Sequence, residues 1–270
     1  MRKIVLVTSM ISALLLAVFV GSSSIRLESH AAEQDCHPKA IRDLQRLSPR
    51  GFAIYEAMQD KKLFLGWLSC DDIQLGLSTA VHESVHNLTE ERDAFPLVKG
   101  GDIKRPHEVS AFFAPSEIAS AFTTRDIFVH DYLRPTGVSS AKDFLYLLDE
   151  LNAFSHDLDS AVALNSLHRN DRQVDHRDGL AAMMAFVMTY VETARKSQPR
   201  TWEGLQKPQP RQVIQTLWSQ AETVMASSCG LSDFGSRDRY YLGLICKPGD
   251  GEALSRLLDR APLCPKACLS

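Results

Sequence analysis

The feature that most limits what this chain can form is a run of uncharged residues interrupted by a short polar pattern. The run Thr79–Leu88 reads T-A-V-H-E-S-V-H-N-L and contains H-E-x-x-H at His82, Glu83 and His86. On a helix, residues four apart lie on one face, one turn from each other. Two imidazoles placed in this way can reach one metal ion, and the adjacent carboxylate can accept a proton from water bound to that metal. The pattern therefore predicts a buried helix with a metal site.

The residues before the motif predict where this helix begins. Asp71 and Asp72 stand where helix N-caps are favoured. Apolar residues then recur at helical spacing from Ile73 to Leu88. We expect one long helix that carries H-E-x-x-H in its C-terminal half.

The run Thr79–Leu88 resembles the active-site helix of the zincin metallopeptidases. Catalytic zinc sites use three protein ligands and one position open to water, so two histidines do not complete such a site. The extended pattern H-E-x-x-H-x-x-G-x-x-H is absent, because Thr89 and Arg92 occupy the positions of its glycine and third histidine. The third ligand must come from further along the chain.

A second predicted helix follows Ser139 and Ser140, and its apolar face includes leucines on both sides of Glu150. A carboxylate on the buried side of a helix needs a partner, and a metal ion is one. The segment Glu150–Phe154, E-L-N-A-F, resembles the E-x-x-A-[FY] segment by which several glutamate-type zincins supply their third ligand. By that resemblance Glu150 completes the site with His82 and His86. Other residues of this helix remain open as ligands or as groups that orient a ligand: Asp149, His156 and Asp157.

Two further runs have the composition of β-strands, His107–Ala114 and Ile127–Leu133, and the charged, glycine-containing stretch Glu90–Arg105 is predicted to be a loop. In the zincin pattern a strand beside the active-site helix binds extended peptide by backbone pairing. Either run can serve that role. The second run contains His130 and Tyr132, which are candidates for stabilising a transition state.

Further along, His168 and His176 flank the charged stretch H-R-N-D-R-Q-V-D-H-R-D. Alternating charges without an apolar period are typical of a solvated connection between helices. We therefore predict a loop here, and a role at the substrate cleft stays open as the alternative. The next segment, Gly179–Arg195, is apolar around most of its circumference and is predicted to be a buried central helix.

The N-terminus has the layout of a secretory signal. Arg2 and Lys3 precede an apolar run, Ile4–Val20, and small polar residues follow at Gly21–Ser24. The alternative is an uncleaved membrane anchor, for which the apolar run is slightly short. We expect residues 1–32 to form the signal, with its cleavage site open, and residues 33–270 to form one exported domain, periplasmic or secreted, with no membrane span after cleavage.

The cysteines agree with export, because all of them follow the signal and their number is even. We expect one bridge to tie down the N-terminal segment and two to be local. These pairs are Cys36–Cys70, Cys229–Cys246 and Cys264–Cys268.

Charge and motifs exclude some functions. The net charge is −3, and there is neither a long basic run nor a glycine-rich phosphate loop, so nucleic acid is not an expected partner. Helical periods dominate the chain. The predicted fold is mainly α with a small β element, an α+β arrangement that by resemblance is zincin-like.

The resemblance implies an exported metallopeptidase that holds one Zn²⁺ per chain and hydrolyses amide bonds with metal-activated water, with Glu83 as the base. Its substrate would be a peptide or protein, including the stem peptide of peptidoglycan. Two alternatives stay open. One is a non-catalytic, disulfide-stabilised helical binding or scaffold protein; the other is a metal site that serves structure alone and has a fourth protein ligand.

Overall fold

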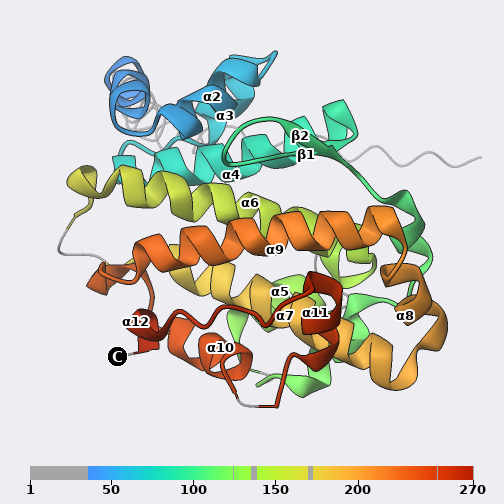
Figure 1. Cartoon of the computed structure of the whole chain (residues 1–270). Helices are drawn as coiled ribbons and strands as arrows, with labels where there is room; N and C mark the ends of the chain where they lie inside the picture. Colours follow the sequence, from blue (N-terminus) through green and yellow to red (C-terminus); the bar gives the residue numbers. More distant parts are fainter. Residues whose placement is uncertain (1–35, 124, 135–138, 170–172, 248, 270) are drawn as a thin grey trace, which may run out of the picture.

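The computed structural model describes residues 36–123, 125–134, 139–169, 173–247 and 249–269, and the predicted signal at residues 1–32 lies outside them. The described chain is mostly helical, with one small two-stranded antiparallel sheet (Figure 1). This confirms the prediction of a mainly α fold with a small β element. The following elements occur in chain order: helical residues 36–47, α2 (Pro49–Ala57), α3 (Lys61–Trp67), α4 (Ile73–Arg92), β1 (Ala94–Pro96), β2 (Asp102–Lys104), α5 (Ile127–Leu133), α6 (Phe144–Ala163), α7 (His176–Ser197), α8 (Pro199–Leu205), α9 (Pro208–Ser228), α10 (Asp238–Ile245), α11 (Glu252–Leu258) and α12 (Lys266–Leu269). Short 3₁₀ helices connect them: η1 (His107–Ala111), η2 (Pro115–Ala121), η3 (Ser139–Ala141), η4 (Asn165–Leu167) and η5 (Ser232–Phe234).

Two long helices, α4 and α6, begin at aspartate caps. The Asp72 side chain accepts a hydrogen bond from the backbone N–H of Leu75, as the sequence predicted for the start of the motif helix. Asp143 caps α6 in the same way, by accepting from the N–H of Leu145. At its other end α4 stops at Asp93, whose φ of 51° turns the chain out of the helix.

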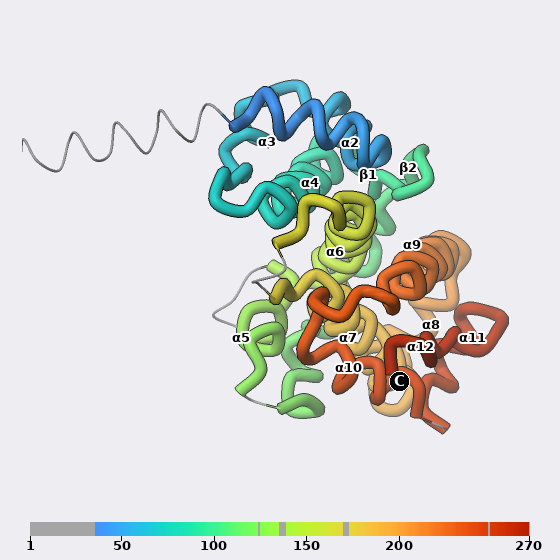
Figure 2. Tube along the Cα trace, turned by 90° about the vertical axis from the view of Figure 1, so that its left-hand side faces the viewer, coloured from blue at the N-terminus to red at the C-terminus, as the bar shows by residue number. Residues whose placement is uncertain are grey.

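The middle of the molecule is built on α6. It packs against α4 on one side and against α7 and α9 on the other, and both views show it between them (Figures 1 and 2). Its apolar residues belong to two hydrophobic clusters: Ala153, together with Leu164 just after the helix, joins the cluster formed with α4 and the N-terminal helices, and Leu151 and Leu158 join the larger one formed with α7 and α9. The side chains of α6 are buried around most of its circumference for this reason.

Helix α7 is buried along most of its length, as predicted for Gly179–Arg195. Its neighbours include α6, α9, α10 and α11. Within the described ranges, no helix combines the length and the apolar character that crossing a bilayer requires.

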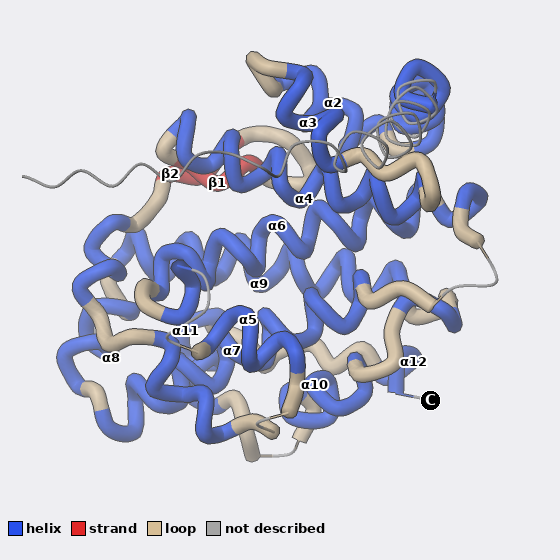
Figure 3. Tube along the Cα trace, turned by 180° about the vertical axis from the view of Figure 1, so that it is seen from behind, coloured by secondary structure: helices blue, strands red, loops and turns tan. Residues whose placement is uncertain are grey.

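Two strand predictions were wrong. His107–Ala114 forms η1 and an irregular end, and Ile127–Leu133 forms α5, while the strands lie in the predicted loop (Figure 3). A short apolar run does not distinguish strand from helix by its period. Here the Asp126 side chain accepts from the N–H of Phe128 and starts a helix. The strands are paired through a turn at Gly100, which has a φ of +90°.

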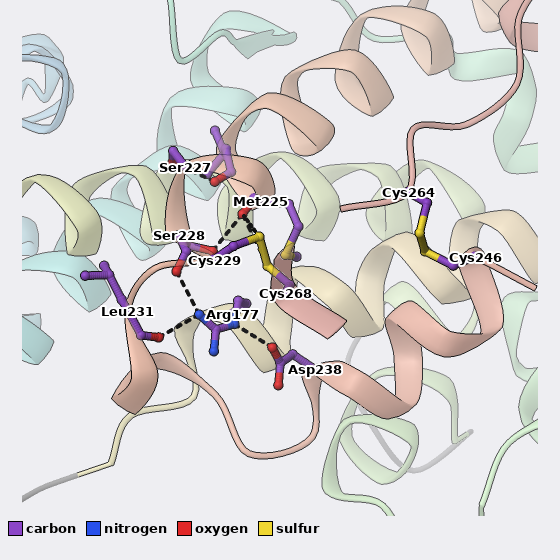
Figure 4. The surroundings of a disulfide bond; sticks show 11 residues. Arg177, Met225, Ser227, Ser228, Cys229, Leu231, Asp238, Cys246, Cys264 and Cys268 are labelled. Carbon is purple, nitrogen blue, oxygen red and sulfur yellow. Dashed lines mark hydrogen bonds and ion pairs between the residues drawn. A yellow bond between two sulfur atoms is a disulfide. The ribbon is translucent and has the colours of Figure 1, made fainter. Parts of the chain in front are cut away.

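Three disulfides cross-link the described chain, and together they include every cysteine in it. Cys36–Cys70 is confirmed, but the two local pairings were wrong: the bridges are Cys229–Cys268 and Cys246–Cys264. The segment after α11 runs back past the end of α10 and then to the end of α9 (Figures 1 and 4). It therefore passes Cys246 first and Cys229 second. The Cα–Cα separations are 5.2 Å for Cys246–Cys264 and 4.5 Å for Cys229–Cys268.

The close approach of α7 to α6 gives a stability prediction. A Cβ at Gly179 would overlap the ring of Phe154, which contacts His82 edge-on at a centroid distance of 4.6 Å. We expect Gly179→Ala to lower the free energy of unfolding by about 1–3 kcal/mol, the usual cost of overpacking. Urea unfolding measures this. The matched control is Gly243→Ala in α10, where a Cβ meets no atom within 4 Å; it should stabilise the protein by about 0.5–1 kcal/mol, and equal effects of the two would contradict the packing account.

Candidate metal centre

The two histidines of the motif meet on the face of α4 that is turned to α6. Their Nε2 atoms are 3.1 Å apart, and the ring centroids are separated by 4.9 Å. His82 is 8% exposed, and the side chain of His86 is 24% exposed. The helix therefore brings both imidazole nitrogens to one point, as the spacing predicted.

Glu150 reaches the same point from α6. Its Oε2 lies 3.7 Å from Nε2 of His82 and 3.5 Å from Nε2 of His86. This oxygen is buried, and among the described residues it has no hydrogen-bond partner. The structure thus brings together His82, His86 and Glu150 as one group that could hold a metal ion.

The three atoms are spaced as zinc ligands are. Zinc binds imidazole nitrogen at about 2.0–2.1 Å and carboxylate oxygen at about 2.0–2.2 Å in a tetrahedron, which sets ligand-to-ligand distances of about 3.3–3.5 Å. The distances here, 3.1, 3.5 and 3.7 Å, surround that range. A cation also supplies the partner that the buried oxygen of Glu150 lacks. The residues present therefore fit the group that the sequence implied.

Asp149 contacts the ring of His86 on the side away from Glu150 and His82. Its Oδ2 lies 2.6 Å from Nδ1 of His86, and the side chain is 4% exposed. If the imidazole donates its Nδ1–H to this carboxylate, its Nε2 lone pair is free to bind a metal. The sequence left Asp149 open as a ligand, and the structure places it next to a ligand instead.

Electrostatics differ between the two imidazoles. Burial lowers the pKa of His82, and the neighbouring His86 lowers it further. Burial also opposes a charge on His86, but its hydrogen bond to Asp149 and the negative charges of Asp149 and Glu150 outweigh that effect and raise the pKa of His86 well above its ordinary value. The two imidazoles therefore differ in their affinity for a proton.

His156 lies away from the metal group. It is 3% exposed, and its Nε2 is 2.9 Å from the backbone carbonyl oxygen of Pro96, to which it donates. Burial lowers the pKa of His156 to about 4, so the ring is neutral at physiological pH. His156 therefore makes a structural hydrogen bond to the end of β1 and is not placed to serve as the alternative ligand.

Asp157 and His176 form a second buried pair. Oδ1 of Asp157 lies 2.9 Å from Nδ1 of His176, and Nε2 of the same ring is 3.5 Å from Oγ of Ser78 on α4. Burial opposes a charge on His176, but the carboxylate of Asp157 outweighs it and raises the pKa of the imidazole. Asp157 therefore orients His176, where the sequence had suggested that it orients a ligand.

His176 corrects the prediction of a solvated loop. It is 2% exposed and begins α7. The sequence signal for it was present, because Asp175 precedes a long apolar period as a helix N-cap residue does. His168, at the other end of the stretch, is partly buried against Phe234 at a centroid distance of 5.5 Å.

A cavity of about 240 Å³ adjoins the metal group. Its walls come from α4, α5, α6 and the first turn of α7, and they include His82, Glu83, Tyr132, Asp157 and His176. Glu83 is half-buried there, beside the first histidine. The exposed side chain of His130 is not part of the wall and pairs with Asp131 instead, at 2.7 Å. Of the two candidates on α5, Tyr132 is thus the one that faces the cavity.

A second set of ligand-type atoms lies at Cys36, His37 and Cys70. The two sulfur atoms are joined in a disulfide. A disulfide offers no thiolate to a metal. This group therefore serves to tie the N-terminal helix to the segment before α4.

Comparisons with protein-family models, with curated proteins and with solved structures found no match to this chain. The most distinctive functional feature of the described residues is the group formed by His82, His86 and Glu150 with the cavity beside it.

The buried, neutral state of His156 predicts a pH dependence of stability. The pKa of His156 is about 4 in the folded state and about 6.5 in an unfolded chain. The unfolded state therefore binds the extra proton first, and stability is lost as the pH falls below about 6.5. For this group alone the loss at pH 5 is about 2 kcal/mol.

Urea unfolding at pH 7 and pH 5 measures the effect. His156→Gln should lose about 2 kcal/mol less than the wild type between these two pH values. The control is His130→Gln, on an exposed side chain, which should keep the wild-type dependence. If the His156 variant also keeps it, the imidazole is not held neutral by burial.

Proposed function

We propose that this chain is a zincin-type metallopeptidase that hydrolyses amide bonds. The observation that carries the proposal is the convergence of three ligand atoms, from His82, His86 and Glu150, beside a cavity whose wall contains Glu83. Two imidazoles and one carboxylate with a position left for water are the ligand set of several catalytic zinc sites.

His82, His86 and Glu150 would hold the ion, with Asp149 fixing the ring of His86 by its contact of 2.6 Å. A bound zinc ion lowers the pKa of a coordinated water and polarises the scissile carbonyl. Ferrous iron also binds two histidines and one carboxylate, so the metal is to be identified by measurement. The proposed assignment is zinc, because the adjacent glutamate of H-E-x-x-H suits hydrolysis.

Glu83 is the proposed general base and acid. It follows His82 directly, and its half-buried carboxylate lines the cavity on the side of the metal group. There it can take a proton from the attacking water and pass it to the leaving amine. The carboxylate has no cation partner among the described ion pairs, so it is available for this exchange.

Tyr132 is the proposed donor to the oxyanion that forms when water adds to the carbonyl. Its side chain lines the cavity opposite α4. Burial, and then the negative charge of Glu150, raises the pKa of Tyr132 far above its ordinary value. The hydroxyl therefore keeps its proton and can donate a hydrogen bond to a developing negative charge.

The proposed substrate is a peptide or a protein, and the stem peptide of peptidoglycan belongs to this class. The proposed location is outside the cytoplasm, in the periplasm or beyond the cell. The disulfides support this location, because such bonds persist in oxidising compartments. The layout of residues 1–32 as a signal supports it from the sequence.

Two alternatives are less well supported. A structural metal site closes with four protein ligands, whereas the group in the described chain has three members. In a scaffold without a metal, a buried carboxylate oxygen is expected to accept a hydrogen bond, whereas Oε2 of Glu150 accepts none among the described residues.

The metal is tested by elemental analysis of the purified protein. We expect about one zinc per chain, and a loss of most of it in Glu150→Ala, because two imidazoles alone bind weakly. Glu117→Ala, on an exposed glutamate of η2, is the control and should keep the metal. Zinc retained in the Glu150 variant would refute the third ligand. No zinc in the wild type after adding it back would favour the scaffold.

The reaction is tested by turnover of a peptide library with the zinc-loaded protein. Glu83→Gln should lower kcat at least about 100-fold, because it removes proton transfer from the transition state. The same variant should keep its zinc, since Glu83 is not in the ligand group. Cleavage that persists at the wild-type rate in this variant would contradict the assigned base.

A further inference from the structure

The first turn of α7 binds three different parts of the molecule with three consecutive residues. His176 pairs with Asp157 and forms part of the cavity wall. The next two residues, Arg177 and Asp178, bind the end of α9 and the start of α10, respectively. All three are buried, with exposures of 2%, 6% and 2%. The position of His176 is therefore set partly from outside the cavity.

Arg177 holds the turn that follows α9. Its Nη1 donates to the backbone carbonyl oxygens of Ser228 and Leu231, at 2.8 Å each, and its Nε donates to Asp238 at 2.5 Å (Figure 4). A buried guanidinium that loses such partners is strongly destabilised. The turn and the start of α7 must therefore move together.

Asp178 fixes the same turn of α7 to the start of α10. Its carboxylate accepts three backbone N–H groups, from Ser236 at 3.0 Å, Arg237 at 2.8 Å and Asp238 at 2.7 Å. These are the donors that a helix start leaves free. The first turn of α7 is thus held to two other helix ends by charged hydrogen bonds.

The Cys229–Cys268 disulfide joins the turn after α9 to α12. Cys229 lies between Ser228 and Leu231, the two residues whose carbonyls bind Arg177. The bridge joins it to Cys268 in α12, and both sulfur atoms lie near the carbonyl oxygen of Met225. Figure 4 shows the bridge beside Arg177, with the Cys246–Cys264 bridge set apart from it. One disulfide therefore constrains the backbone that Arg177 binds, and the other does not.

We propose that the Cys229–Cys268 bridge controls the cavity through Arg177. The bridge holds the turn after α9, Arg177 holds the first turn of α7 to that turn, and His176 is thereby kept at the cavity wall. Arg177 is a positioning residue in this scheme. The consequence for catalysis rests on the proposed function, but the movement of His176 does not.

Opening of the bridge is a two-electron reduction. A dithiol reductant attacks one sulfur, becomes a disulfide itself, and leaves Cys229 and Cys268 as thiols with the two protons that it gives up. The turn after α9 then loses its covalent link to α12. Arg177 then binds a backbone that is less constrained, and we expect the ring of His176 to shift against Asp157.

The experiment follows the imidazole signals of His176 by NMR in the full chain labelled at histidine. His176→Gln identifies the signals by their loss. We expect them to be displaced in Cys229→Ser/Cys268→Ser and to stay in place in Cys246→Ser/Cys264→Ser. The control pair is well matched, because the two bridges span 39 and 18 residues and loop-closure entropy grows only with the logarithm of length.

Arg177 is tested by the same signals. Arg177→Met should displace them as the bridge variant does, and the combined variant should add little, because both changes release one connection. Arg177→Lys should restore part of the wild-type position. In the zinc-loaded protein, kcat on a cleaved peptide should fall about tenfold or more in the Cys229/Cys268 variant, with metal content unchanged.

Several results would overturn the proposal. Unchanged His176 signals after loss of the Cys229–Cys268 bridge would show that the bridge does not reach the cavity. Equal displacement in both bridge variants would show general loosening, and independent, additive effects of the Arg177 and bridge variants would remove Arg177 as the link. Displaced signals without any peptidase activity would keep this connection and refute the proposed function alone.

Discussion

The packing of α4 against α6 is the contact on which the candidate site depends. Neither helix contains a metal site by itself: α4 supplies His82 and His86, and α6 supplies Glu150. Neighbouring residues on α6 point about 100° apart around the helix axis. For this reason Glu150 can face both Nε2 atoms while Asp149 binds Nδ1 of His86.

Ion pairs between α6 and its neighbouring helices explain why so many acidic groups are tolerated inside the molecule. A buried carboxylate is costly unless it is paired, and the pairs here are Asp149 with His86, Asp157 with His176, and Asp159 with Arg50. Glu150 differs, because its Oε2 faces two imidazole nitrogens and has no hydrogen-bond donor within the described part of the chain. An oxygen that is buried without a donor is available to a cation.

The sequence predicted the helices that carry the ligands because their signals are long and mutually consistent. An aspartate cap at Asp72, a sustained helical period and the motif all indicated α4, and the period around Glu150 indicated α6. The strands at His107–Ala114 and Ile127–Leu133 failed because short apolar runs carry no period, and a cap at Asp126 decided the outcome. The two C-terminal disulfide pairings failed for a different reason, since they depend on where the C-terminal segment runs in space.

The same difference in signal length explains why the helices that carry His82, His86 and Glu150 were predictable and the cavity was not. The cavity wall opposite α4 comes from α5 and from the first turn of α7, which are short segments whose conformation is fixed by contacts distant in sequence. His176 reaches the wall because Asp157, 19 residues earlier, pairs with it, and because Asp178 binds backbone groups about 60 residues later, such as the N–H of Asp238. No local pattern contains such contacts. In this chain, therefore, the residues of the candidate metal group lie on helices with a clear sequence period, whereas the shape of the cavity that would select a substrate is set by tertiary contacts.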